Sequence, residues 1–207
     1  MTRLVGELPP RFCWTRFGTE AGQGIQEILD RKERERRAND GLFLWGIGNS
    51  VREGVRELVR NCDQPEVVFS PIKGNPRPVD VHPPAVLSWT AAETLDGEPY
   101  TLPAASLVLS GDKLPARRSH YALVCYSPTP LKLEGSAPTL PFGRLRNLCS
   151  GNPVGWSQVT AVVDMAQLPE SSGHMYPVAF RASLTFPYFL RLTDPIEIEV
   201  RSSGISG

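Results

Sequence analysis

Proline and glycine punctuate this chain along its whole length. It contains 20 Pro and 18 Gly among 207 residues, nearly a fifth of the sequence. Proline fixes φ and lacks a backbone N–H, and both residues mark turns, so the regular elements between them must be short. The pattern favours short strands joined by turns over long helices. Because 41% of the residues are apolar, the chain can still bury a substantial core, which excludes wholesale disorder.

The overall charge argues against one class of function. Lys and Arg number 22, and Asp and Glu also number 22, so the formal net charge is zero. This balance argues against a polybasic protein that binds polyanions by bulk charge, but it leaves a local basic patch open. The length fits one generous domain, and the sequence shows neither an internal repeat nor a clear linker. We therefore expect a single domain over residues 1–207, with an ordered core over 11–200 and a frayed tail over 202–207.

The chain opens with a predicted strand and helix. Residues 11–17 (RFCWTRF) are rich in aromatic and β-branched side chains, which predicts a strand. Apolar residues at helical spacing from residue 25 onward predict a helix. That helix continues into residues 30–37 (DRKERERR), which have no apolar face. We expect this charged run to be an exposed helix end, supported by Glu–Arg pairs at i,i+4; a helix that faces phosphates is the alternative.

A second strand and helix follow. Residues 41–48 (GLFLWGIG) are apolar on both faces, which is typical of a central strand. A helix over residues 51–60 comes next, and Ser50 and Glu53 have the spacing of a capping box.

The rest of the chain is predicted to be rich in short strands. They are expected at residues 66–72, 85–90, 121–126, 159–163, 175–184 and 196–200. Residues 128–153 hold several prolines and glycines and are expected to form a long surface loop. Two helices followed by six to eight short strands fit an α+β domain: a curved or partly closed β-barrel with two N-terminal helices packed on it.

The cysteines and the N-terminus bear on compartment. Cys13, Cys62, Cys125 and Cys149 form no CxxC pair and have no histidine close by in sequence, so we expect no metal site. Free cysteines are often buried and behave as small hydrophobes. The N-terminus lacks the apolar stretch of a signal peptide, and no apolar run approaches the ~20 residues that span a bilayer. These features predict a cytoplasmic protein with reduced thiols and no membrane association.

A turn between the second strand and the second helix can bind an anion. Gly46 and Gly48 allow a close backbone approach, and the following helix N-terminus offers N–H groups to a phosphate. The turn matches neither a phosphate-binding Walker loop nor a dinucleotide fingerprint. Simple helix capping by Asn49 and Ser50 is the alternative.

Catalytic combinations are weak. His82, His120 and His174 belong to no recognisable hydrolase or metal-binding motif. The acidic residues are scattered, and a nucleophile needs a base and an orienting partner. We expect a non-catalytic protein without a cofactor.

Aromatic and basic residues offer better material for binding. The aromatics that stand out are Trp14, Phe43, Trp45, Trp89, Tyr100, Tyr126, Trp156 and Tyr188. A base stacked on one such ring gains about 1–3 kcal/mol, although packing in the core is the alternative for each. The basic residues that could hold phosphates are Arg16, Lys73, Arg117, Arg118, Arg144 and Arg146.

The order of these elements resembles the PUA-like superfold, which includes the EVE, ASCH, YTH and SRA domains. The resemblance rests on the strand–helix–strand–helix opening before a β-rich body. It also rests on residues 176–184 (YPVAFRASL) followed by residues 192–196 (LTDPI), because a strand ending in a short Leu-x-x-Pro-Ile/Val element is common near the end of EVE-like domains. The insertion over 128–153 departs from that pattern.

The resemblance implies a reader of nucleic acid, DNA more than RNA, that accepts a modified base such as 5-methylcytosine flipped into an aromatic pocket. Transferred to this chain, the implied base-binding residues are Trp14, Trp45, Trp89, Tyr126, Asn49, Ser50 and Ser127. The implied phosphate-binding residues are Gly46, Gly48, Arg16, Lys73, Arg117, Arg118, Arg144 and Arg146.

Two alternatives remain open at this point. One is an enzyme acting on nucleotides or nucleic acids that holds phosphate at the Gly46–Ser50 turn. The other is a protein-interaction domain, for example in a bacterial defence system. The sequence does not determine the oligomeric state.

Overall fold

The computed structural model describes residues 8–18, 23–72, 85–102, 107–110, 120–133, 138–166 and 173–200. The chain opens with β1 (Arg11–Phe17), α1 (Ile25–Ala38), β2 (Leu42–Ile47) and, after the short 3-10 helix η1 (Asn49–Val51), α2 (Arg52–Asn61). The predicted strand–helix–strand–helix order is confirmed. Lys73, Arg117, Arg118 and His82, together with the tail over 202–207, lie outside the described residues.

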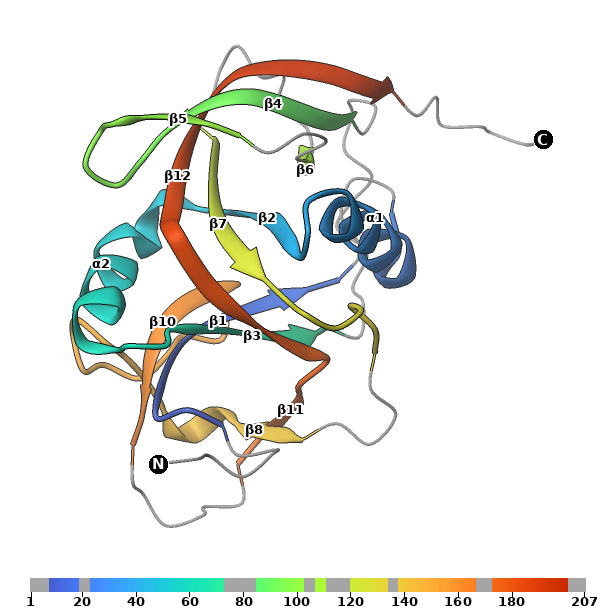
Figure 1. The fold of residues 1–207 in the computed structure, drawn as a ribbon. Coiled ribbons are helices and arrows are strands. Elements are labelled where there is room, and N and C mark those ends of the chain that lie inside the picture. The colour runs from blue at the N-terminus through green and yellow to red at the C-terminus, as the bar shows by residue number, and fades with distance from the viewer. Residues whose placement is uncertain are drawn as a thin grey trace.

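Strands dominate the remainder. They are β3 (Glu66–Pro71), β4 (Ala85–Glu93), β5 (Pro99–Thr101), β6 (Leu107–Ser110), β7 (His120–Tyr126), β8 (Thr139–Pro141), β9 (Leu145–Asn147), β10 (Thr160–Met165), β11 (Met175–Pro177) and β12 (Phe180–Val200), with the 3-10 helix η3 (Phe142–Arg144) between β8 and β9. Figure 1 shows α1 and α2 on opposite sides of the molecule, β4 and β5 at one end and β8 and β11 at the other.

The strands form a mixed sheet that stays open. Its order is β2-β7-β12-β3-β1-β10-β9, and β4, β5 and β6 branch from β12. Only the β1–β3 pairing is parallel among those described. The α+β class is confirmed, but the partly closed barrel is not formed, because in the described chain β2 and β9 end the path without pairing to each other.

The long strand β12 links the parts of the sheet. It pairs in turn with β3, β7 and β4 along its 21 residues. Its last part pairs with β4, which in turn pairs with β5 and β6 in the same sheet. The free edge of β2 is covered by α1, where the Glu35 carboxylate accepts a hydrogen bond from the Leu44 N–H at 2.7 Å, one way in which proteins protect an edge strand.

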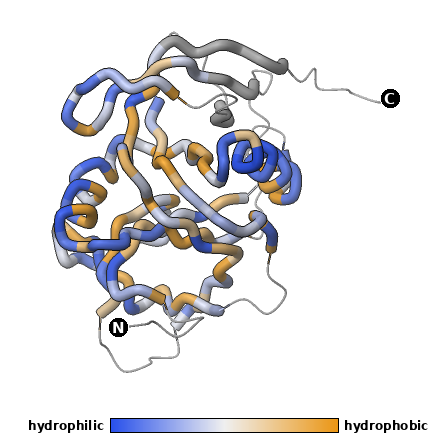
Figure 2. Tube along the Cα trace, viewed as in Figure 1, coloured by the Kyte–Doolittle hydropathy of each residue, from blue (hydrophilic) through white to orange (hydrophobic). Residues whose placement is uncertain are grey.

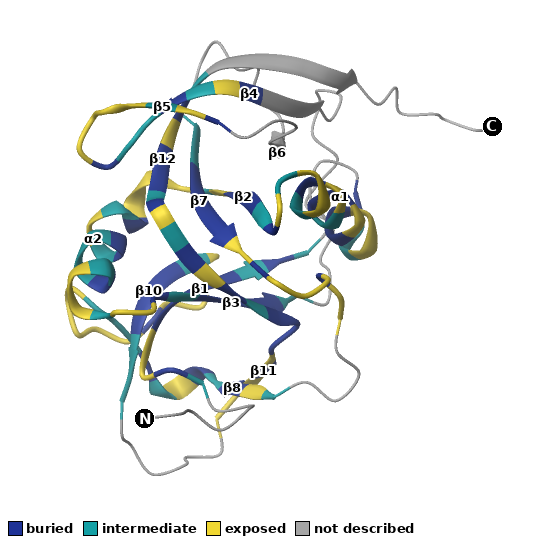
Figure 3. Cartoon of the chain, viewed as in Figure 1, coloured by how far each residue is buried: buried dark blue, intermediate teal, exposed yellow. Residues whose placement is uncertain are grey.

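Period-two alternation in the strands divides the interior into three hydrophobic clusters. In β1, Cys13 and Phe17 face a central cluster that also holds residues of α1 and α2. Phe12 and Trp14 face the opposite side and pack under β8 and β11. On β2, Leu44 belongs to a third cluster beneath β4 and β5. Apolar segments and buried positions coincide along these strands (Figures 2 and 3). Successive side chains of one strand thus serve different cores.

Helix α1 corrects the expectation of an exposed, solvated charged run. Figures 2 and 3 show it as hydrophilic yet partly buried, and Arg31, Lys32 and Glu35 are each at most 3% exposed. Lys32 Nζ lies 2.8 Å from Glu35 Oε2, and burial lowers the pKa of Lys32 to about 8. The charges are tolerated because they are paired and hydrogen-bonded within the fold, which a count of apolar residues does not detect.

Helix α2 packs directly against β10. A Cβ placed on Gly54 would lie 2.8 Å from Val162 Cβ, so glycine sets the close approach of this helix. The predicted capping box is not formed, because no side chain caps η1 or α2. Ser50 lies inside the 3-10 turn rather than before it, and Glu53 instead binds Arg56 Nη1 at 2.6 Å.

The predicted loop over residues 128–153 contains regular structure. Strand β8, helix η3 and strand β9 all fall within it, and β8 pairs with β11 while β9 pairs with β10. Each element is only three residues long. Such short pieces are stabilised by tertiary pairing with distant strands, so the local sequence carries no periodicity that predicts them.

Candidate nucleic-acid interface

The three predicted base-stacking tryptophans lie in three different clusters. Trp14, Trp45 and Trp89 are 0%, 7% and 3% exposed. Trp14 belongs to the cluster under β8 and β11, Trp45 to the central one, and Trp89 to the one beneath β4 and β5. The structure therefore does not bring these rings together around one opening; each completes a separate core.

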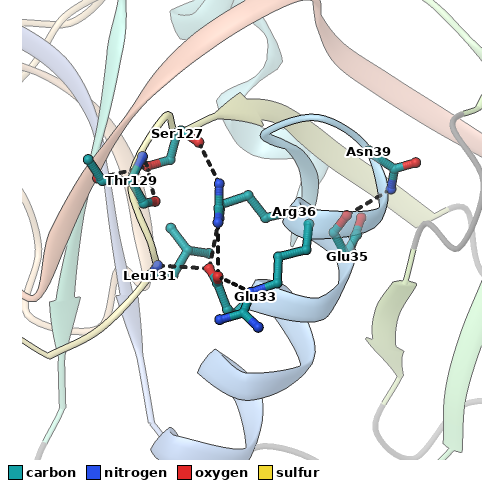
Figure 4. Close-up of polar contacts among 8 residues, drawn as sticks. Glu33, Glu35, Arg36, Asn39, Ser127, Thr129 and Leu131 are labelled. Atoms are coloured by element: carbon teal, nitrogen blue, oxygen red, sulfur yellow. Dashed lines mark hydrogen bonds and ion pairs between the residues drawn. The ribbon is translucent and has the colours of Figure 1, made fainter.

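Tyr126 and Ser127 connect β7 to α1. Tyr126 is partly exposed, and its ring lies against Gly41, where an added Cβ would be 2.6 Å from Tyr126 Cε2. The φ of +100° at Gly41 independently favours glycine. Ser127 is buried; its Oγ donates to the Thr129 carbonyl, and its own carbonyl accepts from Arg36 Nη1 (Figure 4). These hydrogen bonds occupy the polar groups of Ser127 and give it a structural role.

Glu33 is the central residue of the contact between α1 and the chain that follows β7. Its carboxylate accepts hydrogen bonds from Arg36, Arg37 and the Leu131 N–H (Figure 4). The Arg36 hydrogen bond is the main cause that lowers the pKa of Glu33 from 4.5 to about 2. Arg36 and Glu33 of α1 therefore hold the chain after β7 in place.

The predicted phosphate turn is accessible. Gly46, Gly48, Asn49 and Ser50 are all exposed. The nearby Arg52 and Arg56 both donate to the Leu95 carbonyl at the tip of the β4–β5 hairpin. The arginines thus fasten the hairpin to α2, and the turn itself offers backbone groups and the exposed side chains of Asn49 and Ser50.

Three predicted phosphate-binding arginines share one kind of environment. Arg16, Arg144 and Arg146 donate to neutral oxygens and, within the described ranges, form no ion pair with a carboxylate, although Arg146 lies opposite Asp164 in the β9–β10 pairing. Six other arginines form ion pairs: Arg11 with Asp164, Arg36 and Arg37 with Glu33, Arg56 with Glu53, Arg181 with Glu66, and Arg191 with Glu93. In a chain of zero net charge, uncompensated guanidinium groups concentrate positive potential where they lie.

The same region presents an exposed indole. Trp156 is 63% exposed, while its ring lies against buried Phe142, with centroids 4.4 Å apart and planes at 33°. His174 meets it edge-on at 5.5 Å and continues to Tyr176 at 4.8 Å. Tyr176 in turn contacts Trp14 at 5.4 Å. A chain of aromatic contacts therefore runs from the core to the surface and ends on Trp156.

The guanidinium group of Arg16 contacts the buried aromatic rings of this region. Alternation along β1 places it on the same face as Trp14, and its guanidinium carbon lies 5.5 Å from the Trp14 ring and 5.6 Å from the Tyr176 ring, within cation–π range. Nη1 donates to Tyr176 Oη at 3.1 Å, and Nη2 donates to the carbonyls of Trp156 and Gln158 at 2.7 and 2.5 Å. Arg16 thus anchors the segment that carries Trp156.

The turn beneath the indole carries the other two arginines. Phe142 begins η3, Arg144 ends it, and Arg146 Nη1 reaches back to the Gly143 carbonyl at 2.8 Å. Arg144 Nε donates to the Ala166 carbonyl at 2.8 Å. Arg144 and Arg146 are both half-buried, and these hydrogen bonds hold both side chains at the turn that carries Phe142.

Sequence reasoning found part of this surface and missed the rest. Arg16, Arg144, Arg146 and Trp14 were predicted site residues, and the structure brings Arg16 and Trp14 into contact. Phe142, His174 and Tyr176 were missed, because their rings meet only through tertiary pairing of β8 with β11. Trp156 was among the aromatics identified in the sequence as material for binding, but it was not one of the predicted base-binding residues.

No group of His, Cys, Asp or Glu side chains in the described ranges is arranged to hold a metal ion. None of the helices described has the length and apolarity to cross a membrane. Comparison of the chain with protein-family models, with curated proteins and with solved structures found no match.

Proposed function

We propose that this protein is a non-catalytic nucleic-acid-binding module in which a base stacks on the exposed ring of Trp156. The observation that carries the proposal is the combination at one surface of a backed, exposed indole and three arginines without carboxylate partners. Stacking on an aromatic ring contributes about 1–3 kcal/mol per base. Cationic side chains add the salt-dependent attraction for phosphates.

Preorganisation supports the proposal. An exposed side chain that must be ordered on binding loses about 0.5–1.5 kcal/mol. Trp156 is already held by Phe142 at one face and by Arg16 at its backbone carbonyl. The entropy cost of ordering the Trp156 side chain on binding is therefore small, and it offsets little of the stacking free energy.

Tryptophan fluorescence provides a direct test. Trp14, Trp45 and Trp89 are buried, so Trp156 is the exposed one of the four tryptophans. A titration with a mixed-sequence oligonucleotide is expected to quench its emission and protect it from iodide. We expect Trp156→Ala to weaken binding about tenfold, the equivalent of ~1.4 kcal/mol.

A matched control separates stacking from general surface effects. Phe186 is 69% exposed and lies in β12, away from the three arginines in sequence and pairing. Phe186→Ala is expected to bind as the parent does. If Trp156→Ala and the parent bind with equal affinity, or if no oligonucleotide changes the emission, the proposal is wrong.

The proposal also includes three more specific predictions from the sequence: a PUA-like relationship, a cytoplasmic location and a preference for a modified base. The element order supports a PUA-like relationship, and the cysteine pattern supports a cytoplasmic location. Preference for a modified base is tested by pairing each oligonucleotide with its 5-methylcytosine counterpart. Because one methyl group contributes only about 0.8 kcal/mol of burial, the expected preference is no more than a few-fold.

A protein-interaction surface is the second candidate. Val159 and Met175, which neighbour this region in sequence, are also exposed, and clustered apolar side chains mark protein interfaces. Such an interface would depend on Trp156 but would show no oligonucleotide binding, so the same titration distinguishes the two.

A further inference from the structure

We infer that the Trp156 surface selects an unpaired nucleotide in single-stranded nucleic acid over an intact duplex; this rests on the proposed function. The inference comes from the shape of the aromatic surface and from a comparison of two free energies. The same surface chemistry could accept DNA or RNA, so both belong in the test.

The platform has one large exposed ring, the indole of Trp156, next to the smaller exposed imidazole of His174. Phe142 lies against Trp156 at 4.4 Å and is itself 6% exposed, so one side of the indole is backed by the core. His174 meets the indole edge-on at 71°. The remaining aromatics of the chain of contacts, Tyr176 and Trp14, are buried and offer no second face to a base.

A duplex does not present a free base to such a platform. Its bases have both faces covered by neighbours, and extruding one costs a few kcal/mol. Stacking on a single ring contributes about 1–3 kcal/mol of binding free energy, which at best offsets the cost of extruding the base. Enzymes and readers that flip bases add a second stacking wall and hydrogen bonds to the base edge, and here Trp45 and Trp89 are buried in other cores. A base that is already unpaired avoids the extrusion cost.

The arginines fit a single strand as well. Arg16, Arg144 and Arg146 lie around one aromatic turn and are not spread along an extended face. Neutralising about three phosphates of a single strand gives a slope of log K against log salt of about −2. We expect a modest slope of this size.

The experiment compares matched ligands under the same salt conditions. The probes are a 12-nucleotide mixed-sequence DNA strand, the RNA of the same sequence, the blunt DNA duplex, and that duplex with one unpaired nucleotide bulged out. Binding is measured by Trp156 emission and by anisotropy of a labelled strand. We expect the single strands to bind at least tenfold more tightly than the blunt duplex, with the bulged duplex between them.

Two variants show whether stacking causes the difference. Trp156→Phe keeps a flat ring and is expected to retain most of the preference, whereas Trp156→Leu keeps apolar bulk without a π-face and is expected to lose it. Because the residue is exposed, both are expected to fold, as circular dichroism checks.

The outcomes separate the two proposals. If the blunt duplex binds as tightly as the single strand and binding still depends on Trp156, the single-strand inference is overturned and the proposed function stands. If no probe binds, the proposed function fails. If the strand preference persists unchanged in Trp156→Leu, the preference does not come from stacking, and the inference is overturned.

Discussion

Arg16 Nη2 donates a hydrogen bond of 2.7 Å to the backbone carbonyl of Trp156, a residue 140 positions later in the chain. The contact joins the first strand to the turn that carries the exposed indole. Because the same guanidinium also binds Tyr176 Oη and the Gln158 carbonyl, one planar side chain orients three parts of the candidate interface.

This relationship predicts the effect of Arg16→Lys. Lysine keeps the positive charge but lacks the planar fork that reaches three acceptors. We expect nucleic-acid affinity to fall several-fold. We also expect the fluorescence anisotropy of Trp156 to decay faster in time-resolved measurements, because its side chain moves more freely. Arg11→Lys on the same strand, whose guanidinium pairs with Asp164, is the matched control and is expected to leave affinity unchanged. Equal affinities for both variants would contradict a positioning role of Arg16.

Glu33→Gln is expected to loosen the connection between α1 and the chain after β7. The carboxylate accepts charge-assisted hydrogen bonds from Arg36 and Arg37, and such bonds contribute about 1.5–3 kcal/mol. We expect the free energy of unfolding at pH 7 to fall by about that much in urea denaturation. Glu57→Gln on α2, where the carboxylate accepts from Asn61 alone among its described partners, is the control with an expected change near zero.

Acid titration tests the same carboxylate. Its folded-state pKa of about 2 lies below the ordinary value of 4.5, so the folded state binds fewer protons than the unfolded state between these values. The stabilisation by Glu33 is therefore complete above about pH 4.5 and is lost as the pH falls toward 2. The difference in unfolding free energy between the parent and Glu33→Gln should shrink over that window; a constant difference would contradict the assignment.

Lys32→Met probes the buried ion pair of α1. Removing the ammonium leaves Glu35 buried with its main countercharge gone, although its other oxygen still accepts from Leu44. Breaking a buried pair from one side costs about 3–5 kcal/mol, so a large fall in the unfolding midpoint is expected. Arg34→Met, an exposed position on the same helix, is expected to change it little. A loss below 1 kcal/mol for Lys32→Met would show that the pair is not needed.

Gly54→Ala tests the close packing of α2 on β10. Alanine favours a helix over glycine by about 1 kcal/mol, but its Cβ would lie 2.8 Å from Val162 Cβ. Overpacking of this kind costs about 1–3 kcal/mol, so the net effect should be destabilising. In a double-mutant cycle with Val162→Gly, which removes the Cβ that the new methyl group would meet, we expect a favourable coupling between the two substitutions; additive effects would place the strain elsewhere.

The limits of sequence reasoning are clear at particular residues. The apolar run of β2 and the aromatic run of β1 predicted those strands, because alternation is a local property. In α1, however, the pattern of charges at 30–37 predicted exposure, whereas Lys32 and Glu35 are buried as partners. Whether a charged side chain of α1 is buried depends on which elements pack against the helix. Strand β2 packs there only in the tertiary structure, so the local sequence does not reveal it.

The candidate site shows the same division. Tryptophans and arginines could be identified in the sequence as material for binding, but the sequence did not show which rings would be covered. Trp14, Trp45 and Trp89 lie on strands, and each is buried in a different hydrophobic cluster. Trp156 remained outside because its segment is a turn held by Arg16.

By itself, the sequence determined the strands of the first half, the two helices near the N-terminus, the α+β class and the supply of aromatic and basic side chains. All of these follow from local periodicity and from the turns that proline and glycine impose. The sequence did not predict that residues 180–200, expected to belong to two short strands, form the single 21-residue strand β12. The tertiary structure decided that the sheet stays open, which indole reaches the solvent, and which arginines lack a carboxylate partner. Those properties depend on contacts such as Arg16 with Trp156, between residues far apart in the chain, and no local pattern encodes them.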